Sequence, residues 1–118
     1  MKLFDTSALI ENLRKGVFEL GSISVITLIE VLRGVKPEKR NEVKVYLEDS
    51  FEVLPLSNEV ILKYCELYDL LKQRRTLLPD ADLLIAATAI TNNATLVTSD
   101  KDFERLTDVG LSLEIKKN

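Results

Sequence analysis

Residues 79–103 read PDADLLIAATAITNNATLVTSDKDF, and this stretch decides the fold. Leu83 to Ile90 is apolar on every side, which predicts a buried helix, because a helix at the surface keeps a polar face. The β-branched run Thr95 to Thr98 predicts a short strand, and Lys101 to Leu106 predicts a short helix after it. This order of helix, strand and helix indicates a chain in which the two kinds of element alternate.

The same alternation extends through the rest of the sequence. Four further strands are expected, at Lys2 to Phe4, Ser22 to Val25, Phe51 to Leu56 and Leu111 to Ile115. Four further helices are expected, at Ala8 to Lys15, Ile26 to Leu32, Glu38 to Asp49, and over Val60 to Leu71 with Ser57 as N-cap. The pattern predicts an α/β fold, a three-layer α/β/α sandwich around a mainly parallel sheet. Without a linker or repeat, residues 1–118 are expected to form a single domain.

The composition excludes several kinds of chemistry. The chain has 118 residues, with no histidine and no tryptophan, and Cys65 is its only cysteine. These absences rule out Ser-His and Cys-His catalysis, Cys/His zinc sites and internal disulfides. Acid, base or metal chemistry therefore falls to carboxylates, lysines, tyrosines or hydroxyls. Cys65 itself is expected to be a small buried hydrophobe in the long helix.

The charge balance bears on partners and location. The net charge is −3, which argues against a generic electrostatic nucleic-acid binder. An acidic enzyme that acts on phosphates needs a bound cation or a local basic patch. Asp5 interrupts any signal-peptide pattern, and no stretch is long and apolar enough to span a membrane. A soluble cytoplasmic protein with no membrane partner is expected.

Four acidic residues carry the strongest functional signal. Asp5 and Asp100 follow predicted strands, and side chains beyond the carboxyl ends of parallel strands line the ligand crevice. Asp82 falls in the first turn of the apolar helix, which would face the same crevice. Glu30 is the only charged residue in a long apolar interval, where a carboxylate is costly to bury alone. A hard divalent cation, magnesium or manganese, is the simplest relief of their mutual repulsion.

Each acidic residue also has an ordinary structural interpretation. Asp5 could be a turn residue, and Glu30 could form an ion pair with Arg33. Asp80 and Asp82 could cap one helix, and Asp100 and Asp102 could cap another. Independent caps would not be expected to converge on the same end of the predicted sheet. The convergence therefore favours a shared site.

Four motifs in order carry a family resemblance. They are residues 3–7 (LFDTS), 24–34 (SVITLIEVLRG), 79–89 (PDADLLIAATA) and 96–103 (LVTSDKDF). With them the sequence resembles the PIN-domain nucleases, particularly the small prokaryotic VapC-like proteins. The first motif is like the family's D-[TS]-[SN] start, and the second is like its S-x-x-T-x-x-E-x-x-x-G segment. The resemblance spans almost the whole chain, although a glycine often found before Asp82 is missing.

The resemblance implies which residues form the site. Asp5, Glu30, Asp82 and Asp100 match the family's metal-binding acidic quartet, which would hold Mg²⁺ or Mn²⁺. Asp102 lies close enough in sequence to compete with Asp100 for the fourth place. Two neighbouring polar positions, Thr6 and Ser99, would hold water or orient a carboxylate, and Asp80 would be an outer or capping residue.

The predicted function is a Mg²⁺- or Mn²⁺-dependent endoribonuclease. By the same resemblance it would be the toxin of a VapBC-type toxin–antitoxin pair, a homodimer whose antitoxin covers the acidic cleft. Two alternatives stay open. One is a non-catalytic module that binds RNA or an antitoxin. The other is a phosphatase or phospho-acceptor domain, suggested by the D-x-D sequence at residues 80–82.

Overall fold

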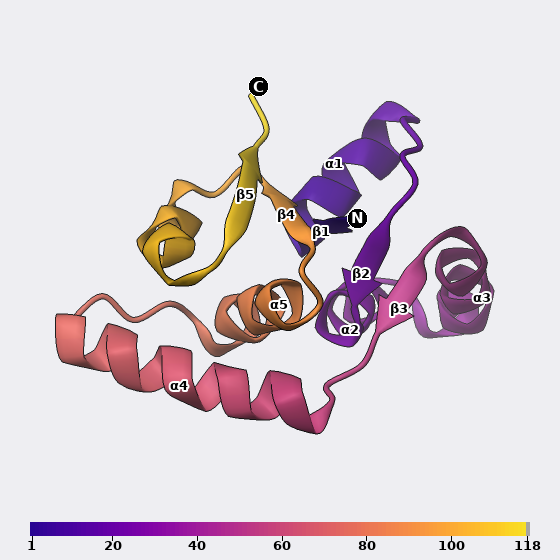
Figure 1. The fold of residues 1–118 in the computed structure, drawn as a ribbon. Helices are drawn as coiled ribbons and strands as arrows, with labels where there is room; N and C mark the ends of the chain where they lie inside the picture. Colours follow the sequence, from indigo (N-terminus) through magenta and orange to yellow (C-terminus); the bar gives the residue numbers. More distant parts are fainter. Residues whose placement is uncertain (118) are drawn as a thin grey trace.

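A five-stranded sheet forms the centre of the molecule (Figure 1). The structure is a computed structural model that describes residues 1–117, so the predicted boundary at residue 118 lies outside the described residues. All four strand pairings are parallel, and the strand order is β3-β2-β1-β4-β5. The strands are β1 (Lys2–Phe4), β2 (Ser22–Ser24), β3 (Glu52–Leu54), β4 (Thr95–Thr98) and β5 (Ser112–Ile115). The predicted mainly parallel sheet is confirmed.

Helices connect the strands in the predicted order. They are α1 (Thr6–Lys15), α2 (Val25–Arg33), α3 (Arg40–Ser50), α4 (Asn58–Arg74) and α5 (Asp80–Thr91), with 3-10 helices η1 (Pro37–Lys39) and η2 (Lys101–Val109). Ser57 caps α4 as predicted, because its hydroxyl accepts from the amide of Val60. The expected helix over Glu38 to Asp49 divides into η1 and α3, since Pro37 begins the segment with a 3-10 turn.

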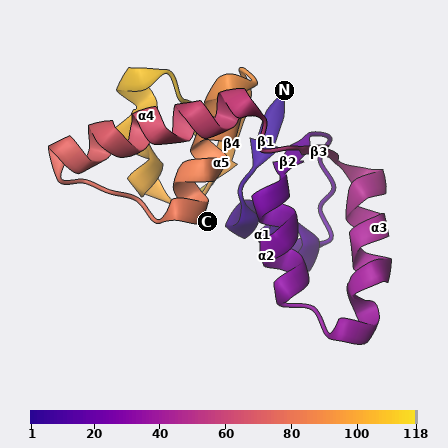
Figure 2. The same ribbon diagram turned by 90° about the horizontal axis from the view of Figure 1, so that it is seen from below.

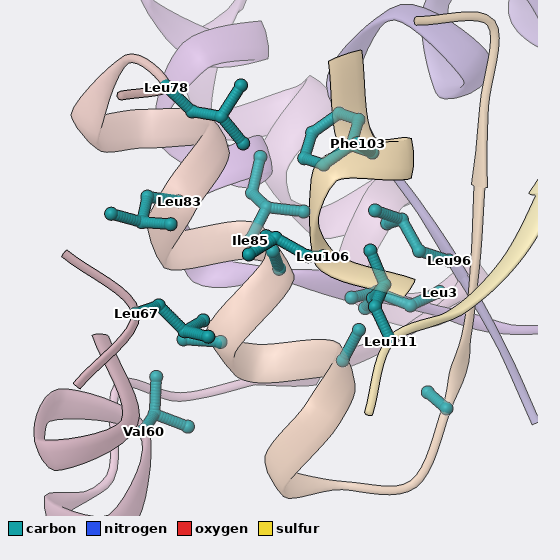
Figure 3. Packing of buried hydrophobic residues seen from close by; sticks show 14 of the residues in the cluster. Leu3, Val60, Leu67, Leu78, Leu83, Ile85, Leu96, Phe103, Leu106 and Leu111 are labelled. Atoms are coloured by element: carbon teal, nitrogen blue, oxygen red, sulfur yellow. The ribbon is translucent and has the colours of Figure 1, made fainter. Parts of the chain in front are cut away.

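Alternate residues of each strand face opposite layers, as a pleated strand requires. Leu3 and Leu96 pack against α4, α5 and η2, whereas Phe4 and Val97 pack against α1 and α3. Figure 2 shows α4 and α5 on one side of the strands and the hairpin of α2 and α3 on the other. Figure 3 shows α5 within the first cluster, together with side chains from other elements such as Leu67, Leu96 and Phe103. The buried-helix prediction for residues 83–90 is confirmed.

The buried-cysteine prediction is wrong. Cys65 is exposed, because the buried positions of α4 are Val60, Leu67 and Leu71, and residue 65 lies off that stripe. Among the described residues, no helix is long and apolar enough to cross a membrane.

The strand order determines where a ligand would bind. From β1 the chain first adds β2 and β3 on one side, and later adds β4 and β5 on the other. A parallel sheet opens a crevice at such a switch point, beyond the carboxyl ends of the two strands. Phe4 pairs with Val97, so β1 and β4 end level with one another. Asp5 and Asp100 follow these two ends.

A close backbone approach occurs at Gly21, immediately before β2. A Cβ atom there would lie 2.6 Å from the Phe4 ring and 2.8 Å from the carbonyl oxygen of Lys2. At Gly34 the nearest atom is 3.6 Å away, and the backbone has φ −86°. The two glycines therefore differ in whether a methyl group fits.

We expect Gly21→Ala to destabilise the fold by about 1–3 kcal/mol, because the backbone of β1 cannot move aside easily. The matched control Gly34→Ala should be neutral or slightly stabilising, since its conformation suits alanine. Urea unfolding midpoints of the two variants and the wild-type chain test this. Equal midpoints for both variants would contradict the packing described for Gly21.

Candidate functional site

Asp5 is buried at the end of β1 and is held by three hydrogen bonds. Its side chain is 5% exposed. Oδ1 accepts from the amide of Ala8 at 2.8 Å and from the Ser7 hydroxyl at 3.1 Å, and Oδ2 accepts from the Thr98 hydroxyl. Asp5 is therefore the N-cap of α1, a structural role that differs from the turn residue considered for it. That role also fixes the carboxylate at the switch point.

Thr98 links the two strand ends, and it was not singled out from the sequence. Its side chain is fully buried; the hydroxyl donates to Asp5 and accepts from the amide of Asp100 at 3.0 Å. Its signal in the sequence is a hydroxyl that closes an otherwise apolar strand. Asp100 is also a cap, because its Oδ1 accepts from the amide of Asp102 at 2.8 Å.

Glu30 is half-buried on α2 and is oriented by Thr6. The Thr6 hydroxyl lies 2.6 Å from Glu30 Oε1 and 3.1 Å from the hydroxyl of Thr27. A hydroxyl has one proton, so when Thr6 donates to the carboxylate, Thr27 is left to donate to Thr6. Thr6 thus orients a carboxylate, as predicted. Within residues 1–117, Glu30 makes no ion pair with Arg33.

Asp82 lies in the first turn of α5, and neither it nor Asp80 caps the helix. The N-cap position is Pro79, which makes no side-chain capping bond. Asp80 instead accepts from the Tyr64 hydroxyl at 2.6 Å, and this bond raises the pKa of Tyr64 to about 12. The capping interpretation of these two aspartates is therefore wrong, because the preceding proline sets the helix start.

The electrostatics of the site place the four carboxylates within range of one another. Burial raises the pKa of Asp82 to about 6, and the charges of Asp100, Asp5 and Glu30 add to the increase. Burial also raises the pKa of Asp5, although its three hydrogen bonds act in the opposite direction. The folded chain therefore keeps anionic groups together at a cost in free energy.

Two other residues named from the sequence point elsewhere. The Ser99 hydroxyl lies 3.5 Å from a carboxylate oxygen of Glu11, and within residues 1–117 it donates to none of the four acidic residues. Asp102 is exposed and forms an ion pair with Arg105 at 3.5 Å. Asp102 donates its backbone amide to Asp100, and the charge of its carboxylate adds to the raised pKa of Asp82.

The donor set fits a hard divalent cation. All four groups supply oxygen ligands, which Mg²⁺ and Mn²⁺ prefer. Across residues 1–117 none of the four carboxylates pairs with a lysine or arginine, so no side chain of the described part neutralises them. In the same range, no three acidic or cysteine side chains gather closely enough to hold an ion as they stand.

Comparison with known proteins identifies the family. The PIN domain family model matches residues 2–109. Ribonuclease VapC1 of Methanocaldococcus jannaschii is 41% identical over 115 residues, covering 94% of this chain and 85% of the relative. Ribonuclease VapC2 of Rickettsia felis is 38% identical over 90 residues, covering 72% of this chain and 67% of the relative.

A solved structure supports the same assignment. The crystal structure of VapBC2 from Rickettsia felis, bound to a DNA fragment from its promoter, matches with a TM-score of 0.83 and 28% identity, covering 98% of each chain. The predicted three-layer α/β/α architecture is thus confirmed. On its sequence and its fold, the chain belongs to the PIN domain family, among the VapC ribonucleases.

Proposed function

We propose that this protein is a Mg²⁺- or Mn²⁺-dependent endoribonuclease, the toxin of a VapBC-type pair, and that Asp5, Glu30, Asp82 and Asp100 form its catalytic metal site. One observation carries the proposal. Four acidic residues without basic partners in residues 1–117 come from four separate elements to the switch point of a parallel sheet. The ribonuclease relatives support the same activity.

The cation and the protein groups have separate tasks. When bound, the cation would polarise a water and the phosphodiester and would offset the charge that develops during hydrolysis. Asp5, held by Thr98, Ala8 and Ser7, offers a carboxylate of fixed orientation. Glu30, held by Thr6, would orient the attacking water or accept its proton. In-line hydrolysis of this kind would leave 5′-phosphate and 3′-hydroxyl ends.

The partners follow from the same proposal. RNA is the substrate, and the VapBC structures that this chain resembles support an antitoxin partner. The antitoxin would cover the four carboxylates. The expected homodimer finds support in the apolar residues exposed along α4, Ile61 and Leu62. The proposed location is the cytoplasm, where an RNA substrate is available.

We expect Asp5→Asn to reduce RNA cleavage by at least about 100-fold, because the side chain loses the charge proposed to hold the cation. Asparagine is also a good N-cap, so α1 and the fold should be retained. Cleavage of a panel of structured RNAs with Mn²⁺, with analysis of the product ends, measures the effect.

Asp102→Asn is the matched control. It makes the same chemical change at an exposed acid beside Asp100, and cleavage should stay within about twofold of wild type. Full activity of Asp5→Asn would reject the proposed site. Loss of activity in Asp102→Asn alone would move the fourth ligand from Asp100 to Asp102.

Removal of divalent cations should abolish cleavage. Excess EDTA should stop the reaction, and added Mn²⁺ or Mg²⁺ should restore it, because the sequence has no histidine and, within residues 1–117, no lysine or arginine pairs with the four carboxylates. Calorimetric titration of wild type and Asp5→Asn with Mn²⁺ checks binding directly. Absence of binding at millimolar cation would favour the non-catalytic alternative, and cleavage in EDTA would reject the metal mechanism.

We expect Asp82→Asn to stabilise the cation-free protein at neutral pH. The pKa of Asp82 is raised in the folded chain to about 6 from 3.8, so folding favours its protonated form. The stabilising contribution of this group is fully present below pH 3.8 and is lost as pH rises through about 6. At pH 7 the variant should gain on the order of 1 kcal/mol after allowance for solvent screening of a half-buried group, or about 4 °C in Tm.

Thermal unfolding in EDTA, followed from acidic to neutral pH, measures this difference. The two melting temperatures should converge near pH 4 and separate as the pH rises to 7. A difference that stays constant with pH, or a variant less stable than wild type at pH 7, would show that Asp82 is not under this electrostatic strain.

A further inference from the structure

A groove of about 500 Å³ runs along α1 and includes Ser7, which donates to Asp5, and Ser99, which precedes Asp100 in the chain. Its lining comes from one face of α1 and from the residue after β4, namely Ser7, Ile10, Glu11, Arg14, Lys15 and Ser99. Positions 7, 10, 11 and 14 follow the helical repeat, so they form a continuous stripe. In Figure 1, α1 lies next to β4 and the end of β5.

The groove begins at the proposed catalytic groups. Ser7 donates to Asp5 Oδ1 at 3.1 Å, and Ser99 lies between Thr98 and Asp100 in the chain. One end of the groove therefore lies close to Asp5 and Asp100, which follow the ends of β1 and β4. A strand whose phosphodiester lies at those carboxylates can continue into this groove.

Of the two basic side chains that line the groove, Arg14 has no charged partner within residues 1–117. Lys15 donates to Glu11 at 2.7 Å, so these two opposite charges neutralise each other. Arg14 is exposed, and within residues 1–117 its guanidinium forms no ion pair or hydrogen bond. A free guanidinium offers a planar set of donors that matches a phosphate.

We infer that this groove binds the RNA strand beside the cleavage point and that Arg14 holds one of its phosphates. The inference rests on the proposed function. Seven residues of helix place Arg14 about 10 Å from Ser7 along the axis, so Arg14 meets a different phosphate from the one between the carboxylates. Ile10 offers an apolar contact to a ribose or base between the two points.

Arg14 also offsets the repulsion between the acidic protein and RNA. A chain of net charge −3 with an anionic crevice repels RNA at long range. A cation bound in the crevice neutralises only the phosphate at that point. Arg14 supplies a second attraction outside the crevice, so the strand is held at two places and its direction across the site is set.

The test is the affinity of the full chain for a fluorescent single-stranded RNA of about 20 nucleotides with Mg²⁺, measured by anisotropy in the Asp5→Asn background so that the RNA stays intact. Adding Arg14→Ala should weaken binding about tenfold, and Arg14→Lys should give an intermediate value. For Arg14→Ala, the slope of log Kd against log salt concentration, measured between about 50 and 200 mM, should be smaller by about 0.7, as expected for one lost phosphate contact.

Arg75→Ala in the same background is the matched control. Arg75 is exposed at the C-terminal end of α4 and forms no ion pair within residues 1–117. Removing Arg75 therefore changes the net charge by the same one unit as removing Arg14. Its affinity for RNA should match that of the parent. Arg14→Gln keeps an aliphatic stem in the groove, so equal weakening in Arg14→Ala and Arg14→Gln assigns the effect to the charge.

Several results would overturn the inference. These are no measurable RNA binding by the parent, equal affinity with and without Arg14, or equal weakening by Arg75→Ala. If Arg14→Ala keeps the RNA affinity of the parent but loses binding of a poly-glutamate peptide, the groove binds a protein and not RNA. In the active chain, Arg14→Ala should raise KM and leave kcat within about twofold. Failure of wild type to cleave any RNA with Mn²⁺ would instead count against the proposed function.

Discussion

The buried carboxylate of Asp5 is the constraint on which the site depends. A charged group in this position is costly unless each oxygen is hydrogen-bonded. The amide of Ala8, the hydroxyl of Ser7 and the hydroxyl of Thr98 meet that requirement. These donors belong to α1 and β4, so satisfying one side chain fixes the start of the helix and the end of the neighbouring strand. Thr98 then accepts from Asp100, which joins the second carboxylate to the first.

The crevice carries an electrostatic cost that the remaining fold offsets. Burial and like charges raise the pKa of Asp82, which means that the ionised form opposes folding. The apolar layers on both faces of the sheet supply the stability that this arrangement removes. An all-carboxylate site without basic partners within residues 1–117 is poor for stability and well suited to a divalent cation. The same absence of counter-charge in the crevice makes an arginine outside it, such as Arg14, important for an anionic substrate.

Much of the fold was accessible from sequence patterns. The uniformly apolar run at residues 83–90 predicted the central helix correctly, and the strand at Thr95 to Thr98 has the predicted bounds. Other features depended on neighbours. Cys65 was expected to be buried, yet only packing against α5 decides which stripe of α4 faces inward. Asp80 was a candidate cap, but Pro79 begins the helix and Tyr64 takes the carboxylate. Thr98 could not be distinguished from an ordinary strand residue until its partner, Asp5, was placed beside it.

By itself the sequence determined the order of elements, the all-oxygen chemistry and the four candidate acidic residues, because hydrophobic periodicity and residue type are local properties. Only the tertiary structure decided which hydroxyls orient the carboxylates, that Ser99 turns to Glu11, and that Arg14, without an ion pair in residues 1–117, shares a groove with Ser7 and Ser99. Residues 5 and 98 are far apart in the chain, and they meet because β1 and β4 pair in parallel register. Contacts of that kind depend on strand order, which no local pattern contains.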